Sequence, residues 1–295
     1  MNKIIRISLI LFLILFTGNH SFSQTSSVKH YGYAAAGKLK IYYCDQGHGP
    51  VVFFLHAGFL DMHQWDREAT PLIKDHRVIT IDLPGHGQST GIDTVIKIAE
   101  VINHVMNYLQ VGRASFVGMS LGAACVVDFA IAHPEKTVKL VLCSPGLSGW
   151  QDVMRLDTLS KQLFMRSDTY GDTHDPQLIS ENFVHLWLDG PFRKTATADS
   201  AARNYVFKTA FEKVSNNKGS GPVFDKKKAA KRIRLIQKPT LILYGNLDIP
   251  FIVQESQYIH KNIKGSQLQV INGTAHLFNF EKPDVFEKYL RSWLK

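Results

Sequence analysis

The fold of this chain is decided by the stretch Phe116-Val117-Gly118-Met119-Ser120-Leu121-Gly122-Ala123-Ala124. The apolar run before the motif, 114–117, predicts a buried strand, and residues 123–130 after it predict a helix. A Gly-x-Ser-x-Gly motif between a strand and a helix is the context of a nucleophile elbow, a sharp strained turn that exposes a serine. Gly118 and Gly122 have no side chains, so the strand and the helix can pass closely. Ser120 is therefore predicted to project from the tip of this turn.

Strands and helices alternate on both sides of the motif. A continuous apolar run, typical of a strand that is buried on both faces, occurs at 51–55, and further strands are predicted at 77–81, 138–143, 240–244 and 267–271. Helical patterns occur at 94–109, 121–133, 251–263 and 284–294. Residues 28–45 alternate and contain glycines, which predicts an antiparallel hairpin at one sheet edge. The whole pattern predicts an α/β fold with a mostly parallel central sheet and helices on both faces.

The pattern changes after residue 144, where the chain becomes helical and polar-aromatic and loses its strong strands until 236. We interpret this segment as a helical lid insert over the carboxyl ends of the strands. The predicted organisation is a signal peptide at 1–23, a first part of the core at 24–148, the lid at 149–236 and a second part of the core at 237–295. Most lid aromatics are expected to pack against one another, and some are expected to line a pocket mouth.

The composition indicates a globular protein. Of 295 residues, 45% are hydrophobic, and 34 Lys and Arg outnumber 25 Asp and Glu. The basic residues are spread along the chain without interleaved aromatics, which argues against nucleic-acid binding. One basic run, 226–234, is interpreted as a solvated helix face, and a contact with an anionic membrane surface is the alternative. The sequence gives no indication of oligomeric state.

The first residues are expected to be a targeting signal. Lys3 and Arg6 precede an apolar run of ten residues, 7–16, which is too short for a comfortable membrane span. Small residues at Ser21 and Ser23 predict cleavage between Ser23 and Gln24. The protein is thus expected to be exported, periplasmic or secreted, with no membrane span after signal removal. An uncleaved N-terminal anchor is the alternative.

Neither a metal site nor a cofactor is expected. The three cysteines, Cys44, Cys125 and Cys143, do not have metal-ligand spacing. Cys125 falls in a helix and Cys143 ends an apolar strand, so both are interpreted as small buried hydrophobes without a disulfide.

Polar residues that follow predicted strands suggest an active site. In a parallel sheet, functional groups collect at the carboxyl ends of the strands. Ser120, Asp248 and His276 each follow a strand, in the order Ser, Asp, His that this topology favours. A serine hydroxyl needs a base, and an imidazole needs an acceptor that fixes its tautomer. Asp82 and Asp152 are alternative acids at less suitable positions, and His56 is interpreted as a brace of its loop.

Five stretches together resemble the α/β-hydrolase family, in its group of serine esterases, lactonases and cofactor-free haloperoxidases. They are His56-Ala57-Gly58-Phe59, Asp82-Leu83-Pro84-Gly85-His86-Gly87-Gln88-Ser89, the Ser120 motif, Gly245 to Asp248 with Pro250, and Gly273 to His276. One departure is Ala57, where the family more commonly has glycine. The resemblance implies Ser120 as nucleophile, His276 as base and Asp248 as its orienting acid.

The same resemblance implies an oxyanion hole made by the backbone N–H groups of Gly58 and Leu121, with Phe59 as a less favoured donor. Leu121 opens a helix, whose free N–H groups carry partial positive charge. One such donor is typically worth about 3 kcal/mol of transition-state stabilisation.

These observations predict a serine hydrolase that cleaves a small or apolar carboxylic ester or lactone through an acyl-enzyme. A serine rather than an aspartate at the elbow argues against dehalogenase and epoxide hydrolase chemistry. C–C bond hydrolysis, amide hydrolysis and perhydrolysis remain alternatives on the same triad. A non-catalytic protein that uses the cavity to bind a ligand is the alternative from another class.

Overall fold

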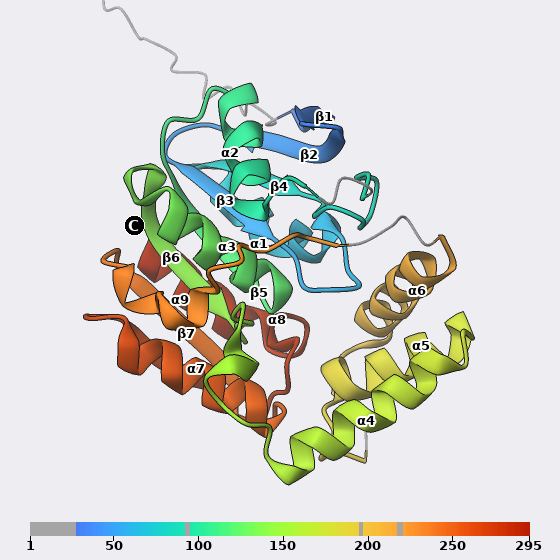
Figure 1. Cartoon of the computed structure of the whole chain (residues 1–295). Helices are drawn as coiled ribbons and strands as arrows, with labels where there is room; N and C mark the ends of the chain where they lie inside the picture. The colour runs from blue at the N-terminus through green and yellow to red at the C-terminus, as the bar shows by residue number, and fades with distance from the viewer. Residues whose placement is uncertain (1–27, 92–94, 195–196, 217–220) are drawn as a thin grey trace, which may run out of the picture.

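The computed structural model describes residues 28–91, 95–194, 197–216 and 221–295, so the predicted signal peptide lies outside the described residues. Its centre is a sheet with the strand order β1-β2-β4-β3-β5-β6-β7-β8 (Figure 1). The strands are β1 (His30–Ala36), β2 (Leu39–Gly47), β3 (Val51–Leu55), β4 (Arg77–Ile81), β5 (Ala114–Met119), β6 (Thr137–Cys143), β7 (Thr240–Gly245) and β8 (Gln267–Ile271). Strands β3 to β8 run parallel, and the β1–β2 hairpin joins β4 antiparallel at one edge.

Helices cover both faces of this sheet, as the apolar strands require. One core contains side chains of α2 (Ile98–Tyr108), α3 (Leu121–Ala132) and α7 (Pro250–Asn262). The other contains side chains of α1 (Asp66–Leu72) and α9 (Pro283–Leu294), with α8 (Phe278–Glu281) beside them. The predicted α/β fold with a mostly parallel sheet is confirmed.

Most element boundaries agree with the sequence pattern to within a few residues, and the main differences concern helices. Helix α2 begins at Ile98 rather than at residue 94, which lies outside the described residues. Helix α1 was not predicted, because it is short and contains Pro71, which weakens a helical signal. Helix α3 ends at Ala132, two residues before Pro134, as expected from the loss of a backbone donor there.

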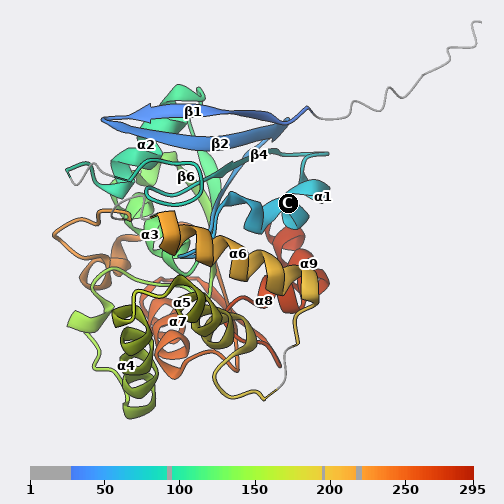
Figure 2. The ribbon, with the colours of Figure 1, turned by 90° about the vertical axis from the view of Figure 1, so that its right-hand side faces the viewer.

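The segment between β6 and β7 is helical. It contains α4 (Thr158–Asp172), α5 (Pro176–Phe183), the π-helix η4 (Val184–Asp189) and α6 (Ser200–Asn216), which together are called the helical insert. Figures 1 and 2 show α4, α5 and α6 gathered on one side of the molecule, with α4 and α5 far from the β1–β2 hairpin. Asp157 and Asp175 cap α4 and α5 by accepting backbone N–H bonds.

The basic run at 226–234 is not a helix face, and that interpretation was wrong. Two short 3-10 turns, Ala229–Lys231 and Ile233–Leu235, interrupt the run. Arg232 lies 3.9 Å from the Asp225 carboxylate, which also pairs with Lys97 at 3.3 Å. Part of this positive charge is therefore neutralised locally.

Cys44, Cys125 and Cys143 are buried free thiols, and burial was predicted for Cys125 and Cys143. Among the described residues, no helix is both long and apolar enough to cross a membrane.

Candidate active site

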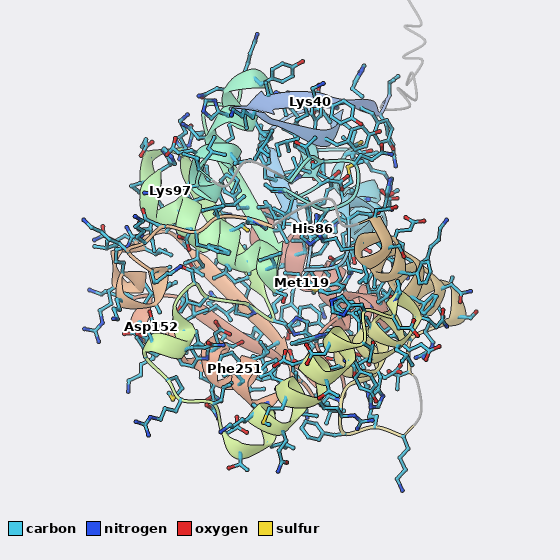
Figure 3. All side chains as sticks on the ribbon, turned by 45° about the vertical axis from the view of Figure 1, so that its right-hand side comes forward. Lys40, His86, Lys97, Met119, Asp152 and Phe251 are labelled. Carbon is cyan, nitrogen blue, oxygen red and sulfur yellow. The ribbon has the colours of Figure 1, made fainter. Side chains whose placement is uncertain are left out.

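Ser120 occupies the strained turn that the glycine pattern predicted. Its backbone φ is 52° and ψ −113°, a region that non-glycine residues rarely adopt and that costs on the order of 1–3 kcal/mol. Main-chain hydrogen bonds to the end of β6 and the residues after it hold the turn. Ser120 N donates to Cys143 O at 2.9 Å, and Gly146 N donates to Ser120 O at 3.0 Å. Figure 3 labels the preceding residue, Met119, in the middle of the molecule.

Both glycines of the motif are required by close packing. A Cβ atom on Gly122 would lie 2.2 Å from the carbonyl oxygen of Leu55 on β3. A Cβ atom on Gly118 would lie 2.6 Å from the backbone of Gly122. The strand and the helix therefore approach so closely that no other residue fits without a shift of backbone.

The structure brings Asp248 and His276 together. Asp248 follows β7 and His276 follows β8, and His276 Nδ1 lies 2.8 Å from Asp248 Oδ2. Both residues are 2% exposed. The other carboxylate oxygen, Oδ1, accepts a bond from Ile249 N at 2.8 Å. A carboxylate can only accept, so with Asp248 in that form Nδ1 would donate and Nε2 would be left able to take a proton.

Ser120 and His276 line the same cavity. Its volume is about 140 Å³, and its other lining residues are Ala57, Gly58, Phe59, Phe183 and Trp187. The Trp187 ring packs on the His276 imidazole with 4.5 Å between centroids, and Phe59 stacks on Phe183 at 4.9 Å. Two aromatic residues of the helical insert, Phe183 and Trp187, thus form one wall. Trp150, which precedes the insert, packs on Tyr258 of α7 instead.

The two expected oxyanion donors are Gly58, which lines this cavity, and Leu121, which directly follows Ser120. A Cβ atom on Gly58 would lie 3.7 Å from Leu121 Cδ2, and Leu121 is the first residue of α3. Phe59 has a positive φ of 65°, and its ring stacks on Phe183 of the helical insert. The loop after β3 and the start of α3 therefore meet beside Ser120.

The other histidines and acids near the strand ends serve as braces. His56 Nε2 accepts a bond from Leu83 N at 2.9 Å, and its Nδ1 donates to Ala57 O at 2.7 Å. Burial lowers the pKa of His56 to about 4, so it stays neutral. Asp82 accepts bonds from Met62 N at 2.8 Å and Gln88 N at 2.7 Å. Both residues thus hold the loops after β3 and β4.

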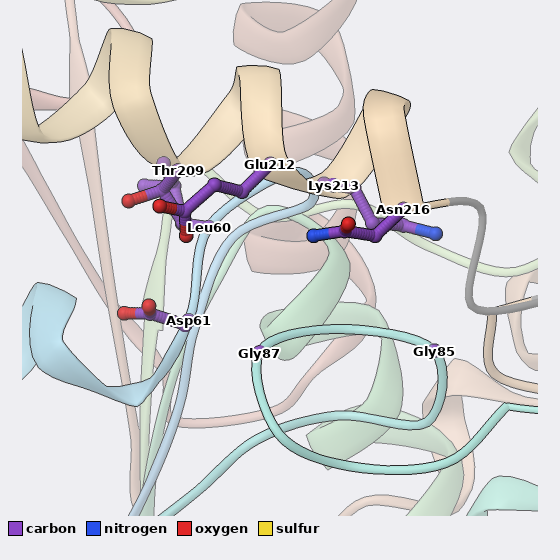
Figure 4. A pocket seen from close by; sticks show the side chains of 8 residues that line it. All are labelled: Leu60, Asp61, Gly85, Gly87, Thr209, Glu212, Lys213 and Asn216. Carbon is purple, nitrogen blue, oxygen red and sulfur yellow. The ribbon is translucent and has the colours of Figure 1, made fainter.

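A second cavity, under α6, is too small to hold a substrate. It lies between the last turns of α6 and the loop of Gly85 and Gly87, near Asp61 (Figure 4). Its volume of about 40 Å³ leaves room for only a few water molecules. Within the described ranges, no group of three or more His, Cys, Asp or Glu residues is placed to hold a metal ion.

Sequence analysis did not identify Trp187 as the neighbour of the imidazole, nor the ion pair of Arg193 with Glu281. Arg193 NH1 lies 2.6 Å from Glu281 Oε2, next to the loop that carries His276. Neither residue belongs to a motif with a known spacing, so only the folded chain brings them together. A tryptophan among many aromatics of the helical insert gives no sequence signal of its own.

Comparisons with known proteins agree with this fold. A family model described as the alpha/beta hydrolase fold matches residues 50–283. The 3-oxoadipate enol-lactonase 1 of Acinetobacter baylyi is 23% identical over 251 residues, which cover 83% of this chain and 89% of that enzyme.

A 2-hydroxy-6-oxononadienedioate/2-hydroxy-6-oxononatrienedioate hydrolase of Escherichia coli K12 is 25% identical over 286 residues, covering 88% of this chain and 92% of that one. Among solved structures, an esterase from Exiguobacterium antarcticum matches with a TM-score of 0.73 and 18% identity, over 90% of this chain and 99% of that chain. The family model spans most of the chain, so the resemblance of its motifs is confirmed. The chain belongs to the α/β-hydrolase fold family.

Proposed function

We propose that this hydrolase cleaves small, uncharged carboxylic esters or lactones through an acyl-enzyme on Ser120. The observation that carries the proposal is the cavity shared by Ser120 and His276, with Asp248 behind the imidazole at 2.8 Å. A strained serine, a neutral imidazole nitrogen and a carboxylate are the parts that nucleophilic acyl transfer needs.

The proposed reaction follows from the position of each group. Ser120 Oγ attacks the acyl carbon while His276 Nε2 takes the hydroxyl proton, and Asp248 stabilises the imidazolium. The imidazolium then protonates the leaving alcohol oxygen as the C–O bond breaks. A water molecule, deprotonated by His276, attacks the acyl-enzyme, and the acid leaves as Ser120 regains its proton.

We assign the oxyanion hole to the backbone N–H groups of Gly58 and Leu121. Support comes from the contact between these two residues and from the place of Leu121 at the start of α3. The partial positive charge of a helix N-terminus stabilises a developing oxyanion.

The lining of the cavity favours uncharged substrates. His276 is the only residue with an ionisable side chain among the seven described residues that line it, and the walls are Phe59, Phe183 and Trp187. The names of the two relatives describe action on acidic molecules, an oxoadipate lactone and a dioate. A carboxylate in this cavity would meet no cation, so its desolvation would be uncompensated. We therefore expect this chain to differ from those relatives in substrate.

The test is intact-mass analysis of the protein after exposure to a fluorophosphonate. We expect one adduct on the wild type and none on Ser120→Ala or His276→Ala. A panel of p-nitrophenyl esters and lactones with short, long and carboxylated acyl groups then defines the substrate class. A folded wild-type protein that stays unlabelled would contradict serine catalysis and favour the ligand-binding alternative.

We also propose that the protein is exported, on the basis of the pattern at 1–23. Expression in a bacterial host and N-terminal sequencing of the product tests this. A mature N-terminus at Gln24 is expected, and an intact Met1 in the cytoplasmic fraction would contradict it.

A further inference from the structure

The loop that carries His276 is held by a buried ion pair that joins the helical insert to the core. Arg193 lies just after η4 and Glu281 ends α8, and their side chains are only 12% and 2% exposed. The pair is closed by Arg193 NH1 and Glu281 Oε2 at 2.6 Å. A charge pair with so little solvent around it is strengthened by the low local dielectric but has a large desolvation cost.

Glu281 uses both carboxylate oxygens. Oε1 accepts a bond at 2.7 Å from the backbone N–H of Ala275, the residue directly before His276. Oε2 accepts from Arg193 NH1 and from Thr197 Oγ1 at 2.5 Å. One side chain therefore ties the helical insert to the peptide that precedes the imidazole.

The Arg193 guanidinium donates hydrogen bonds both to the end of η4 and to the loop that carries His276. Its NH1 donates to Gly273 O at 3.2 Å, at the start of the loop of His276. Its NH2 donates to Leu188 O at 3.3 Å, and its Nε donates to Asp189 O, both at the end of η4. The planar guanidinium thus joins the end of η4 to the His276 loop, an arrangement that lysine cannot reproduce.

The helical insert also contacts His276 on its other sides. The Trp187 ring packs on the imidazole, and Trp187 O accepts a bond from Leu277 N at 3.1 Å. Gly190, with φ 83°, approaches so closely that a Cβ atom there would lie 2.7 Å from Ala275 Cβ. The residues before and after His276, and His276 itself, are therefore all in contact with the helical insert.

We propose that Arg193 and Glu281 are positioning residues, which orient the His276 imidazole by fixing the Gly273–Ala275 peptides against the helical insert. The proposal rests on the proposed function of His276 as the base. In this proposal, the desolvation cost of the buried ion pair is offset by a functional gain, because the pair fixes the geometry of the His276 loop. Neither side chain touches the substrate; both act through the backbone on which the base is mounted.

The test compares Arg193→Met and Glu281→Ala with a control ion pair elsewhere. Arg77→Met is a matched control. The Arg77 guanidinium donates two hydrogen bonds to the partly buried Asp45 carboxylate and a third to the carbonyl oxygen of Leu109, near the opposite ends of the strands. Each variant is measured for thermal unfolding, for kcat and KM with p-nitrophenyl butyrate, and for the rate of fluorophosphonate labelling. The downfield proton NMR signal of His276 Nδ1–H reports the imidazole directly.

We expect Arg193→Met and Glu281→Ala to lower kcat and the labelling rate by about 10- to 100-fold, with a smaller change in KM, because a misplacement near 1 Å has that effect. The Nδ1–H signal should broaden in both. Arg77→Met should lose comparable thermal stability and keep the wild-type kcat, labelling rate and signal. Glu281→Gln keeps an acceptor for Ala275 N, and Arg193→Lys keeps the charge, so each should retain more activity than its harsher counterpart.

A folded Arg193→Met or Glu281→Ala with wild-type kcat, labelling rate and NMR signal would overturn the proposal. If either variant fails to fold, Glu281→Gln and Arg193→Lys provide the same readouts, and wild-type values in both would overturn it equally. Failure of the proposed function is distinguishable, because then the wild-type protein itself would not be labelled, or Ser120→Ala would be.

Discussion

The two halves of the candidate site are held in different ways. Ser120 is held by main chain alone: two glycines allow β3, β5 and α3 to converge, and backbone bonds to Cys143 and Gly146 close the turn. His276 is held by side chains, namely Asp248, Trp187 and Glu281. The Ser120 turn can be predicted from a local sequence motif, because neighbouring residues form it. The position of His276 depends on side chains distant in the sequence, so no local motif predicts it. The comparison predicts which substitutions destroy the site and which only misalign it.

The largest loss of stability and activity is expected from substitutions at the Ser120 turn, which main-chain packing holds. Gly122→Ala places a methyl group 2.2 Å from Leu55 O, so β3 or α3 must shift. We expect a loss of roughly 4 kcal/mol in the free energy of unfolding, with loss of labelling. Denaturant unfolding measures it. Gly112→Ala, where a Cβ meets nothing within 4 Å, is the control. A stable, active Gly122→Ala protein would refute the argument that close packing requires this glycine.

Asp248→Asn should leave the fold intact and remove most of the activity. The amide can donate to Nδ1, which favours the tautomer whose Nε2 carries the proton and cannot act as base. A decrease in kcat of about 10⁴-fold is expected, with an unchanged unfolding midpoint. Steady-state kinetics and thermal unfolding check both. Asp82→Asn is the comparison, because its contacts are with backbone at Met62 and Gln88; an equal loss of kcat there, in a folded protein, would contradict the assignment of Asp248.

Outside both halves of the candidate site, α1 carries a buried acid. Glu68 on α1 is 2% exposed, and its two carboxylate oxygens have no hydrogen-bond partner within the described part of the chain. Burial raises the pKa of Glu68 from 4.5 to about 8. In the unfolded chain this group ionises near pH 4.5, so the free energy of unfolding falls as the pH rises from about 4.5 to about 8.

The glutamine side chain in Glu68→Gln cannot ionise, so the free energy of unfolding of this variant should not decrease with pH in that range. The variant should match the wild type below pH 4.5 and exceed its stability at pH 8 by on the order of 4 kcal/mol. Urea unfolding at several pH values measures the difference. Glu135→Gln, a change at an exposed side chain, serves as control. Parallel stability curves for wild type and Glu68→Gln would show that Glu68 is not a buried neutral acid.

The smallest effect is expected at the helical insert. Trp187→Ala enlarges the cavity, so the ratio of kcat/KM for long over short acyl esters should rise by about 10-fold. Trp187→Phe keeps a ring on the imidazole and should change the ratio less. Phe211→Ala, a partly exposed aromatic of α6 that does not line the cavity, is the control. An unchanged ratio in Trp187→Ala would mean that this wall does not select the acyl group.

The strands and most helices were predictable because their signals are local. Strands were predicted at 51–55, 77–81 and 267–271, and the structure has a strand with the same bounds at each place. Ser120, Asp248 and His276 were found because the carboxyl ends of parallel strands share one edge, so position along the chain translates into position in space. The basic run at 226–234 was misinterpreted because charge periodicity without an apolar face does not make a helix.

The sequence by itself determined the α/β fold, the strained serine turn and the order of the polar groups behind the strands, because each depends on residues that are close in the chain. Only the tertiary structure decided that Trp187 packs on the imidazole and that Arg193 meets Glu281, 88 residues away in the chain. Such contacts depend on how the helical insert sits on the sheet, which many weak packing interactions decide together. The grouping of Ser120, Asp248 and His276 behind the strands was therefore predictable from the sequence, whereas the shape of the cavity beside them was not.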